Sequence, residues 1–267
     1  MKHVFAICAY QDSPYLQACA DSLLCQEEPS PILLCTATPS EKLAALAREH
    51  GFLYRVNPDG PNIAGDWNFA MAQARAEGAD FVTLCHQDDL YLPGYGRAFR
   101  RAAQADPELL IYFSGYGERR GENTVTDSML LRIKRTLLLP LRPRFAQRWL
   151  MNKRLALAFG DGICCPAVTY NLNRLPRPLF ERGMSTNLDW QTWERLSRLP
   201  GRFAYDPQTL MLHRIHPGST TSQVLGEGGR TEQDLAMFRQ FWPEPIARWL
   251  TRIYALSEKS NSLRKDG

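Results

Sequence analysis

The stretch FVTLCHQDD, residues 81–89, joins an apolar run to a group of charge-bearing side chains. Its first half has the length and composition of a buried strand, and His86, Asp88 and Asp89 follow where that strand ends. Two adjacent carboxylates repel each other unless a positive charge lies beside them. The stretch therefore predicts a divalent-cation site at the carboxyl end of a strand. A solvated turn in which an aspartate caps the next helix is the alternative interpretation.

Around this stretch, β-rich runs alternate with stretches of helical spacing. The expected strands are 4–9, 32–35, 52–56, 81–84 and 109–113, and the expected helices are 14–25, 40–50, 64–76 and 93–105. Further strand-like runs follow at 163–170, 202–205 and 209–214. Ser40 and Gly51 are typical of the start and end of the second helix. Such alternation predicts βαβ units and a mostly parallel sheet flanked by helices. In sheets of this kind, ligands bind at the carboxyl ends of the strands.

Several classes of protein are excluded by what the 267 residues contain. The loop after the first strand, AYQDSP at 9–14, has no Gly-x-Gly-x-x-Gly, and the chain has no Gly-Lys-Ser/Thr, so neither a dinucleotide site nor a phosphate loop is expected. The formal net charge of +4 is too small to indicate nucleic-acid binding. Without an apolar run long enough for export or for a membrane span, a cytoplasmic protein with structural cysteine thiols is expected.

Three further stretches could carry chemistry. Residues 62–68 open a helix behind the third strand, where the helix N-terminus could face phosphates or simply be capped. Residues 187–193 hold Asp189 beside two tryptophans, whose rings could pack on a sugar or belong to the core. Residues 212–222 carry two histidines and an arginine before a small polar loop, which could bind a metal and phosphates or be ordinary polar residues.

The middle of the chain is strongly basic. Residues 129–154 contain eight Lys and Arg, no acid, and many bulky apolar residues between them. Pro140 and Pro143 are expected to divide this segment into two helical pieces. Interleaved basic and apolar residues favour a helix on an anionic membrane surface, with contact through Arg132–Arg148 at the inner face of a membrane. A helical hairpin packed on the core and a different anionic partner are the alternatives.

In chain order, these motifs resemble the family 2 glycosyltransferases with the GT-A fold. ICAYQ at 7–11 is similar to the family's start, and Tyr15-Leu16 and SLLCQ at 22–26 follow at the usual spacing. The resemblance covers residues 3–115 and returns at 162–171 and 189–222. It implies one Rossmann-like α/β domain with a mostly parallel central sheet flanked by helices. The implied parts are a nucleotide-sugar half at 1–115, a helical basic insertion at 116–160, an acceptor-side half at 161–228 and a helical tail at 229–267.

The resemblance also implies roles for individual residues. A nucleotide-sugar donor would contact Tyr10, Asp66, Asn68, His86, Asp88 and Arg214. A metal ion, Mn²⁺ or Mg²⁺, would be held by Asp88, Asp89 and His216. Asp189 would be the general base, and Trp190 and Trp193 would bind the acceptor. The chain departs from the family at His86, which replaces the first carboxylate of Asp-x-Asp, and at 36–40, where TATPS replaces Asp-Asp-x-Ser.

The implied activity is inverting transfer of a sugar from a nucleoside-diphosphate donor, by default a UDP-sugar, to a glycan or lipid-linked acceptor, as in polysaccharide biosynthesis. Two other functions are considered. A nucleotidyltransferase would have glycine and a cation in the loop after the first strand, and residues 10–15 contain neither. A sugar-nucleotide-binding protein with a decayed catalytic site is the other alternative, because His86 replaces a carboxylate.

Overall fold

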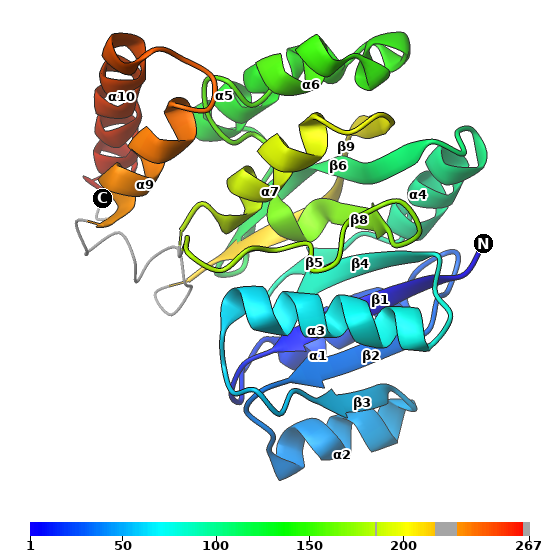
Figure 1. Cartoon of the computed structure of the whole chain (residues 1–267). Coiled ribbons are helices and arrows are strands. Elements are labelled where there is room, and N and C mark those ends of the chain that lie inside the picture. Colours follow the sequence, from blue (N-terminus) through cyan, green and yellow to red (C-terminus); the bar gives the residue numbers. More distant parts are fainter. Residues whose placement is uncertain (185, 217–228, 264–267) are drawn as a thin grey trace.

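The computed structural model describes residues 1–184, 186–216 and 229–263, and its described part contains a nine-stranded sheet (Figure 1). The first half supplies the parallel strands β1 (His3–Ala9), β2 (Ile32–Thr36), β3 (Leu53–Val56) and β4 (Phe81–His86). They are connected by α1 (Leu16–Leu24), α2 (Glu41–His50) and α3 (Ile63–Ala76), and α4 (Tyr95–Gln104) follows them. Parallel pairing of β1 with β2 and β4 brings the carboxyl ends of these strands to one edge.

The helix boundaries follow from local capping. The Ser40 hydroxyl accepts a hydrogen bond from the Leu43 N–H at 3.2 Å, and Gly51 ends α2 with φ +68°. At α3, the Asn62 side chain accepts a hydrogen bond from the Gly65 N–H at 2.9 Å. These contacts satisfy backbone groups that a helix end leaves without partners. The expected caps at Ser40 and Gly51 are confirmed.

The second half adds five strands, of which only β5 and β7 have no counterpart in the sequence pattern. They are β5 (Leu90–Tyr91), β6 (Leu109–Arg120), β7 (Asn123–Val125), β8 (Val168–Asn171) and β9 (Arg202–Ile215). The sheet order is β3-β2-β1-β4-β8-β6-β9-β5, with β7 paired to β6. β8 is antiparallel to β4 and β6, whereas β6 and β9 are parallel. The predicted α/β sheet is therefore confirmed as mostly parallel, with antiparallel strands at β5, β7 and β8.

Two expectations about the second half were wrong. Residues 202–205 and 209–214 were expected as separate strands, but they form one strand, β9, with a bulge at Pro207 and Gln208. The bulge fits against Gly115, where a Cβ atom would lie 2.8 Å from the Pro207 carbonyl oxygen. The helical insertion was expected from residue 116, but β6 continues to Arg120 and the first helix begins at Met129.

The basic insertion consists of short helical pieces. They are α5 (Met129–Leu137), η1 (Leu139–Leu141), η2 (Arg144–Arg148) and α6 (Leu150–Leu155). Two pieces were expected, and the structure has four: Pro140 lies in the first turn of η1 and Pro143 directly precedes η2, because proline cannot continue a regular helix. Within the described ranges, no helix has both the length and the apolar character needed to cross a bilayer.

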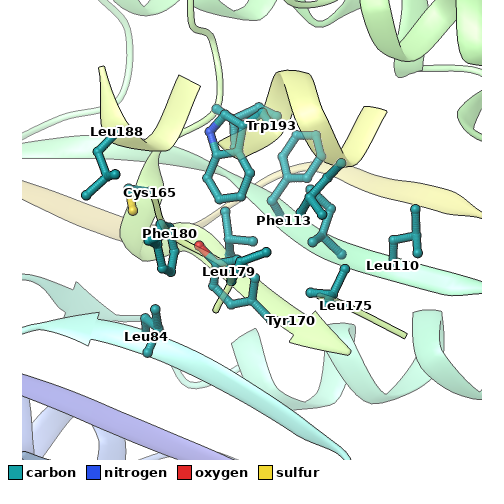
Figure 2. Packing of buried hydrophobic residues seen from close by; sticks show 14 of the residues in the cluster. Leu84, Leu110, Phe113, Cys165, Tyr170, Leu175, Leu179, Phe180, Leu188 and Trp193 are labelled. Carbon is teal, nitrogen blue, oxygen red and sulfur yellow. The ribbon is translucent and has the colours of Figure 1, made fainter. Parts of the chain in front are cut away.

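The tryptophans at 190 and 193 belong to the core. Both lie on α7 (Leu188–Ser197), and both have 0% exposed surface. Figure 2 shows Trp193 over the sheet near Phe113 and Tyr170, and the Trp193 and Tyr170 ring centroids are 5.8 Å apart. Their expected role in acceptor binding is therefore wrong, because neither ring presents a face to solvent. The apolar spacing of the helix that they share placed them inward instead.

The C-terminal helices are part of the same core. α9 (Gly229–Phe238) and α10 (Glu244–Leu263) bring Phe238 and Tyr254 against Trp190, at ring-centroid distances of 5.1 and 6.0 Å. The Trp242 indole N–H also donates a hydrogen bond to the Ala158 carbonyl behind α6. The predicted helical tail therefore exists, and it packs on the domain (Figure 1).

Replacing Trp193 with alanine should lower the free energy of unfolding by about 3–5 kcal/mol, because the change opens a large cavity in the core. Urea denaturation followed by circular dichroism measures the difference. The matched control is Trp249→Ala on α10, whose side chain is 59% exposed and which should change the free energy by less than about 0.5 kcal/mol. Equal losses in the two variants would contradict the assignment of Trp193 to the core.

Candidate functional site

The candidate site lies where β1, β4 and β9 reach the carboxyl edge of the sheet. The loops after β1 and β4 are joined by two reciprocal hydrogen bonds. The Tyr10 N–H donates to Gln87 Oε1 at 3.1 Å, and Gln87 Nε2 donates to the Tyr10 carbonyl at 2.9 Å. The Tyr10 side chain remains 52% exposed. The edge therefore presents a fixed loop pair with one aromatic ring open to solvent.

Asp89 is a buried carboxylate with 0% exposure that connects the β4 loop to β9. Its Oδ1 accepts a hydrogen bond from the Arg214 N–H at 2.8 Å and lies 3.0 Å from His213 Nδ1. Burial alone would lower the pKa of His213, but the negative charge of Asp89 raises it above its usual value. Asp89 Oδ2 is buried and has no hydrogen-bond partner. One oxygen of Asp89 therefore holds β9, and the other remains available to a ligand.

Asp88 contacts the end of β9 from the other side. Its Oδ2 lies 2.9 Å from His216 Nε2, and its carbonyl accepts a hydrogen bond from Arg214 Nε at 2.8 Å. Burial alone would raise the pKa of Asp88, but the charge of His86 and the hydrogen bond from His216 lower it. The expected proximity of Asp88 and His216, far apart in the chain, is present in the structure.

Tyr15, at the start of α1, supports this arrangement. The Arg214 guanidinium lies 4.5 Å from the Tyr15 ring centroid, and the His216 ring lies 4.7 Å from it. The Arg214 side chain contacts the Tyr15 ring and the Asp88 carbonyl, so it connects β9 to α1 and to the loop after β4. The resemblance includes Tyr15 but implies no role for it, and nothing in the linear pattern indicates that it contacts β9.

His86, Asp88 and Asp89 could together hold a metal ion. Each offers a ligand atom, and these atoms lie within 4.8 Å of one another. His86 Nε2 and Asp89 Oδ2 are both buried without a hydrogen-bond partner, which is costly unless a ligand satisfies them. The His86 ring stacks on Trp67 at 5.3 Å, so its orientation is fixed. Two carboxylates and an imidazole suit Mn²⁺ better than Mg²⁺, which prefers oxygen ligands.

The start of α3 carries two residues that were predicted to contact the donor, Asp66 and Asn68. The Asp66 carboxylate lies at this edge and accepts hydrogen bonds from Asn57 Nδ2 at 2.8 Å and from the Asn62 N–H at 3.2 Å. Asn68 does not fit a donor contact. Its Oδ1 accepts the N–H groups of Leu179 and Phe180, and its Nδ2 donates to the Phe180 carbonyl. The prediction for Asn68 was wrong because both the oxygen and the nitrogen of its side-chain amide are hydrogen-bonded to the backbone at residues 179–180.

Asp189 lies in the first turn of α7, where its Oδ1 accepts a hydrogen bond from the Trp190 N–H at 2.8 Å. Burial raises the pKa of Asp189, and the charges of Lys134 and His86 partly oppose this rise. The influence of His86 places the Asp189 carboxylate within electrostatic reach of the candidate metal site. A carboxyl group with a raised pKa is suited to accept a proton near neutral pH.

Asp161 and Lys134 belong to the surroundings of Asp189, and the sequence did not indicate either. Asp161 Oδ1 accepts a hydrogen bond from the Ile163 N–H at 2.9 Å. Burial, and then the negative charge of Asp189, raise the pKa of Asp161 well above its usual value. Lys134 on α5 favours the ionised form of both carboxyl groups. These three residues come from separate segments, so no motif could have grouped them.

The small polar loop expected after His216 begins at residue 217, and residues 217–228 lie outside the described part of the structure. The serine of the predicted Arg-x-His-x-x-Ser element, Ser219, is therefore not placed.

Comparison with known proteins identifies the fold. No protein-family model matches the chain, and no curated protein sequence matches it. Among solved structures, S. aureus TarS 1-349 in complex with UDP-GlcNAc is similar with a TM-score of 0.63 at 13% identity, over 94% of this chain and 70% of that one. The mannosyltransferase PcManGT from Pyrobaculum calidifontis, with GDP-Man and Mn²⁺, gives 0.60 at 12% identity over 97% and 75%.

Glucosyl-3-phosphoglycerate synthase from Mycobacterium tuberculosis, in complex with Mn²⁺, UDP and phosphoglyceric acid, gives a TM-score of 0.53 at 14% identity, over 91% of this chain and 79% of that one. At these identities the similarity establishes the architecture alone. The chain therefore has the GT-A glycosyltransferase fold, as the sequence motifs implied.

Proposed function

We propose that the protein is a glycosyltransferase that moves a sugar from a nucleoside-diphosphate donor with the help of a divalent cation. The observation that carries the proposal is the group formed by His86, Asp88 and Asp89 at the carboxyl edge of a GT-A sheet, whose ligand atoms lie within 4.8 Å of one another. The three similar structures contain UDP-GlcNAc, GDP-Man with Mn²⁺, and UDP with Mn²⁺. A nucleotide sugar with Mn²⁺ is therefore the ligand class proposed here.

The proposed metal ligands are Asp88, Asp89 and His86, with His216 beside Asp88 as a further ligand. When bound, the cation would neutralise charge that develops on the leaving diphosphate. The protein prepares this site by keeping Asp88 ionised and by leaving one oxygen of Asp89 without a hydrogen bond. On this interpretation His86 replaces the missing carboxylate of Asp-x-Asp as a ligand rather than as a ribose contact.

The nucleoside is proposed to lie over the loops after β1 and β2. Tyr10 offers an exposed ring on which a base can stack. The family's aspartate is absent at 36–40, but Asp12 Oδ1 accepts a hydrogen bond from the Ser40 hydroxyl at 2.6 Å and brings a carboxylate to the same loop. This supports a UDP-sugar as the donor, with Asp12 near the base and Asp66 at the edge of the site.

Asp189 is proposed as the general base. Its carboxylate would accept the proton of an acceptor hydroxyl as that oxygen attacks the anomeric carbon. Attack from the face opposite the leaving diphosphate inverts the anomeric configuration. Asp161 and Lys134 are proposed as positioning residues, because they set the charge around Asp189 from two different segments.

A donor screen with Mn²⁺, measuring release of nucleoside diphosphate, tests the activity. Asp189→Asn should lower turnover by about 10²–10⁴-fold because the proton acceptor is lost. Calorimetry should show unchanged donor binding in this variant.

Asp88→Asn should weaken Mn²⁺ binding, measured by electron paramagnetic resonance, together with turnover. Asp21→Asn on α1, an exposed carboxylate far from this edge, is the matched control and should change neither quantity.

Three results would count against parts of this proposal. Equal loss of donor binding in Asp189→Asn would contradict its role as a base. Donor binding by the natural protein without any turnover would favour the decayed sugar-nucleotide-binding protein. No binding of any sugar nucleotide in the presence of Mn²⁺ would contradict the proposed function as a whole.

The pH dependence of turnover should report the charges around Asp189. A base must be deprotonated, so turnover falls when the pH drops below the raised pKa of Asp189. Lys134→Gln removes a positive charge that favours the carboxylate, so the acidic limb of the kcat profile should move to higher pH. Asp161, whose pKa is raised further by the charge of Asp189, stays protonated where Asp189 titrates, so Asp161→Asn should leave that limb in place. Arg132→Gln, an exposed change on the same helix, is the control, and an unmoved limb in Lys134→Gln would reject the assignment.

The acceptor is proposed to be a glycan or a lipid-linked glycan, reached from an anionic membrane surface at the inner face of a membrane. Exposed apolar side chains cluster on the insertion at Phe145, Trp149, Leu150 and Met151, with exposures of 69%, 56%, 54% and 76%. The basic residues of the insertion contribute less free positive charge to this surface than the sequence suggested. Arg132 pairs with Asp127, and Arg148 pairs with Asp106 and Glu108.

The double variant Phe145→Ser/Trp149→Ser should pellet less with phosphatidylglycerol vesicles than the natural protein does, because two interfacial side chains are lost. Vesicle sedimentation measures the bound fraction. Leu24→Ser/Val56→Ser removes two apolar side chains of 45% and 43% exposure elsewhere and should leave pelleting unchanged. If the natural protein and both double variants pellet to the same extent, the exposed apolar patch of the insertion does not contact the membrane.

A further inference from the structure

A hollow of about 570 Å³ lies away from the candidate active site, along α4 and the first half of β9. Its third wall comes from the insertion, at Arg142 and Arg144 on either side of Pro143. None of the residues proposed to bind the donor, the metal or the acceptor lines it. Its volume is within the range of small-molecule binding sites. The hollow is therefore a separate feature of the fold.

Arginine is the prevailing side chain in this hollow. The five that line it are Arg97, Arg101, Arg142, Arg144 and Arg202, and Asp206 is the single lining acid. Arg97 pairs with Glu27 at 2.9 Å, and Arg202 lies 3.7 Å from Asp106. Arg101, Arg142 and Arg144 have no carboxylate within ion-pair distance in the described part of the chain. Three guanidinium groups thus face one hollow without a neutralising partner.

The electrostatics of Arg202 show that this positive charge is not balanced. Burial lowers the pKa of Arg202, Asp106 partly opposes that effect, and the charges of Arg144 and Arg148 lower the pKa further. Two like charges from η2 therefore lie near Arg202. A bound anion would relieve this repulsion and would gain from each guanidinium that it contacts.

A second observation, independent of the arginines, comes from Tyr112. This tyrosine on β6 lines the hollow with a side chain that is 1% exposed, and its hydroxyl is buried without a hydrogen-bond partner. An unsatisfied buried hydroxyl costs free energy unless a ligand accepts its hydrogen bond. Because arginines line the same hollow, an oxyanion is a suitable acceptor.

We propose that this hollow is a binding site for a phosphate-bearing ligand. Guanidinium groups bind phosphate oxygens through paired, charge-assisted hydrogen bonds, and several of them can share one phosphate. The Tyr112 hydroxyl supplies one more donor at the bottom of the hollow. The phosphate belongs either to a soluble phosphorylated compound or to the headgroup of an anionic lipid, and Phe145, next to Arg144, is exposed as a lipid contact would be.

Calorimetric titration in metal-free buffer tests the site with inorganic phosphate and sodium tripolyphosphate as probes. The absence of metal keeps the active-site edge from binding them. Saturable binding is expected, and Arg101→Gln/Arg144→Gln should weaken it by roughly tenfold or more, because two charge-assisted contacts are lost. Tyr112→Phe, which keeps the ring in the core, should weaken it less. Lys42→Gln/Arg174→Gln lowers the net charge equally at exposed positions outside the hollow and should leave binding unchanged.

Vesicle sedimentation with phosphatidylglycerol and phosphatidylcholine distinguishes the two sources of phosphate. Binding of the soluble probes that is lost in the Arg101/Arg144 variant supports a soluble ligand. Loss of phosphatidylglycerol pelleting in that variant, with no binding of the soluble probes, supports a lipid headgroup. Equal losses in the test and control variants, or no binding to any probe, would overturn the proposal. None of these outcomes depends on sugar transfer, so the proposed function stands or falls separately.

Discussion

The buried Asp89 carboxylate is the interaction on which the candidate site depends. Its Oδ1 accepts the Arg214 N–H and contacts His213, so the end of β9 is held against the loop that follows β4. This attachment brings His216 to Asp88 and Arg214 to Tyr15. A carboxylate without exposure is tolerated there because it has a backbone donor and a histidine with a raised pKa beside it. Without that link, the two acidic residues after β4 would be an ordinary turn.

The sequence predicted those parts of the fold that depend on local pattern. Strand and helix alternation through residue 115, the caps at Ser40 and Gly51, and the polar cluster after β4 all follow from spacing and from turn chemistry. The proximity of Asp88 and His216 was predicted from the order of the motifs along the chain, through the resemblance that this order carries. The bulged strand β9 was read as two strands because Asp206 and Pro207 have the composition of a break, and only its pairing with β6 shows that it is continuous.

The sequence was less informative wherever one residue type has two possible environments. Trp190 and Trp193 suit a sugar-binding surface and a core equally well, and packing against the sheet and the C-terminal helices decides for the core. The side-chain amide of Asn68 could bind a ligand or the backbone, and its hydrogen bonds all go to the backbone at residues 179–180. Lys134 and Asp161 influence Asp189 only through the tertiary fold, so the local sequence pattern could not predict that they belong to its surroundings.

The packing of α9 and α10 on Trp190 gives the C-terminal segment a mechanical role. Asp189 accepts the N–H of Trp190, whose ring packs against Phe238 and Tyr254, so helices from the far end of the chain support the backbone at the carboxylate. Proteolytic trimming or a bulky fusion that displaces these helices would reach Asp189 before it disturbed the parallel strands. α9 and α10 are thus part of the packing that keeps this carboxylate in place.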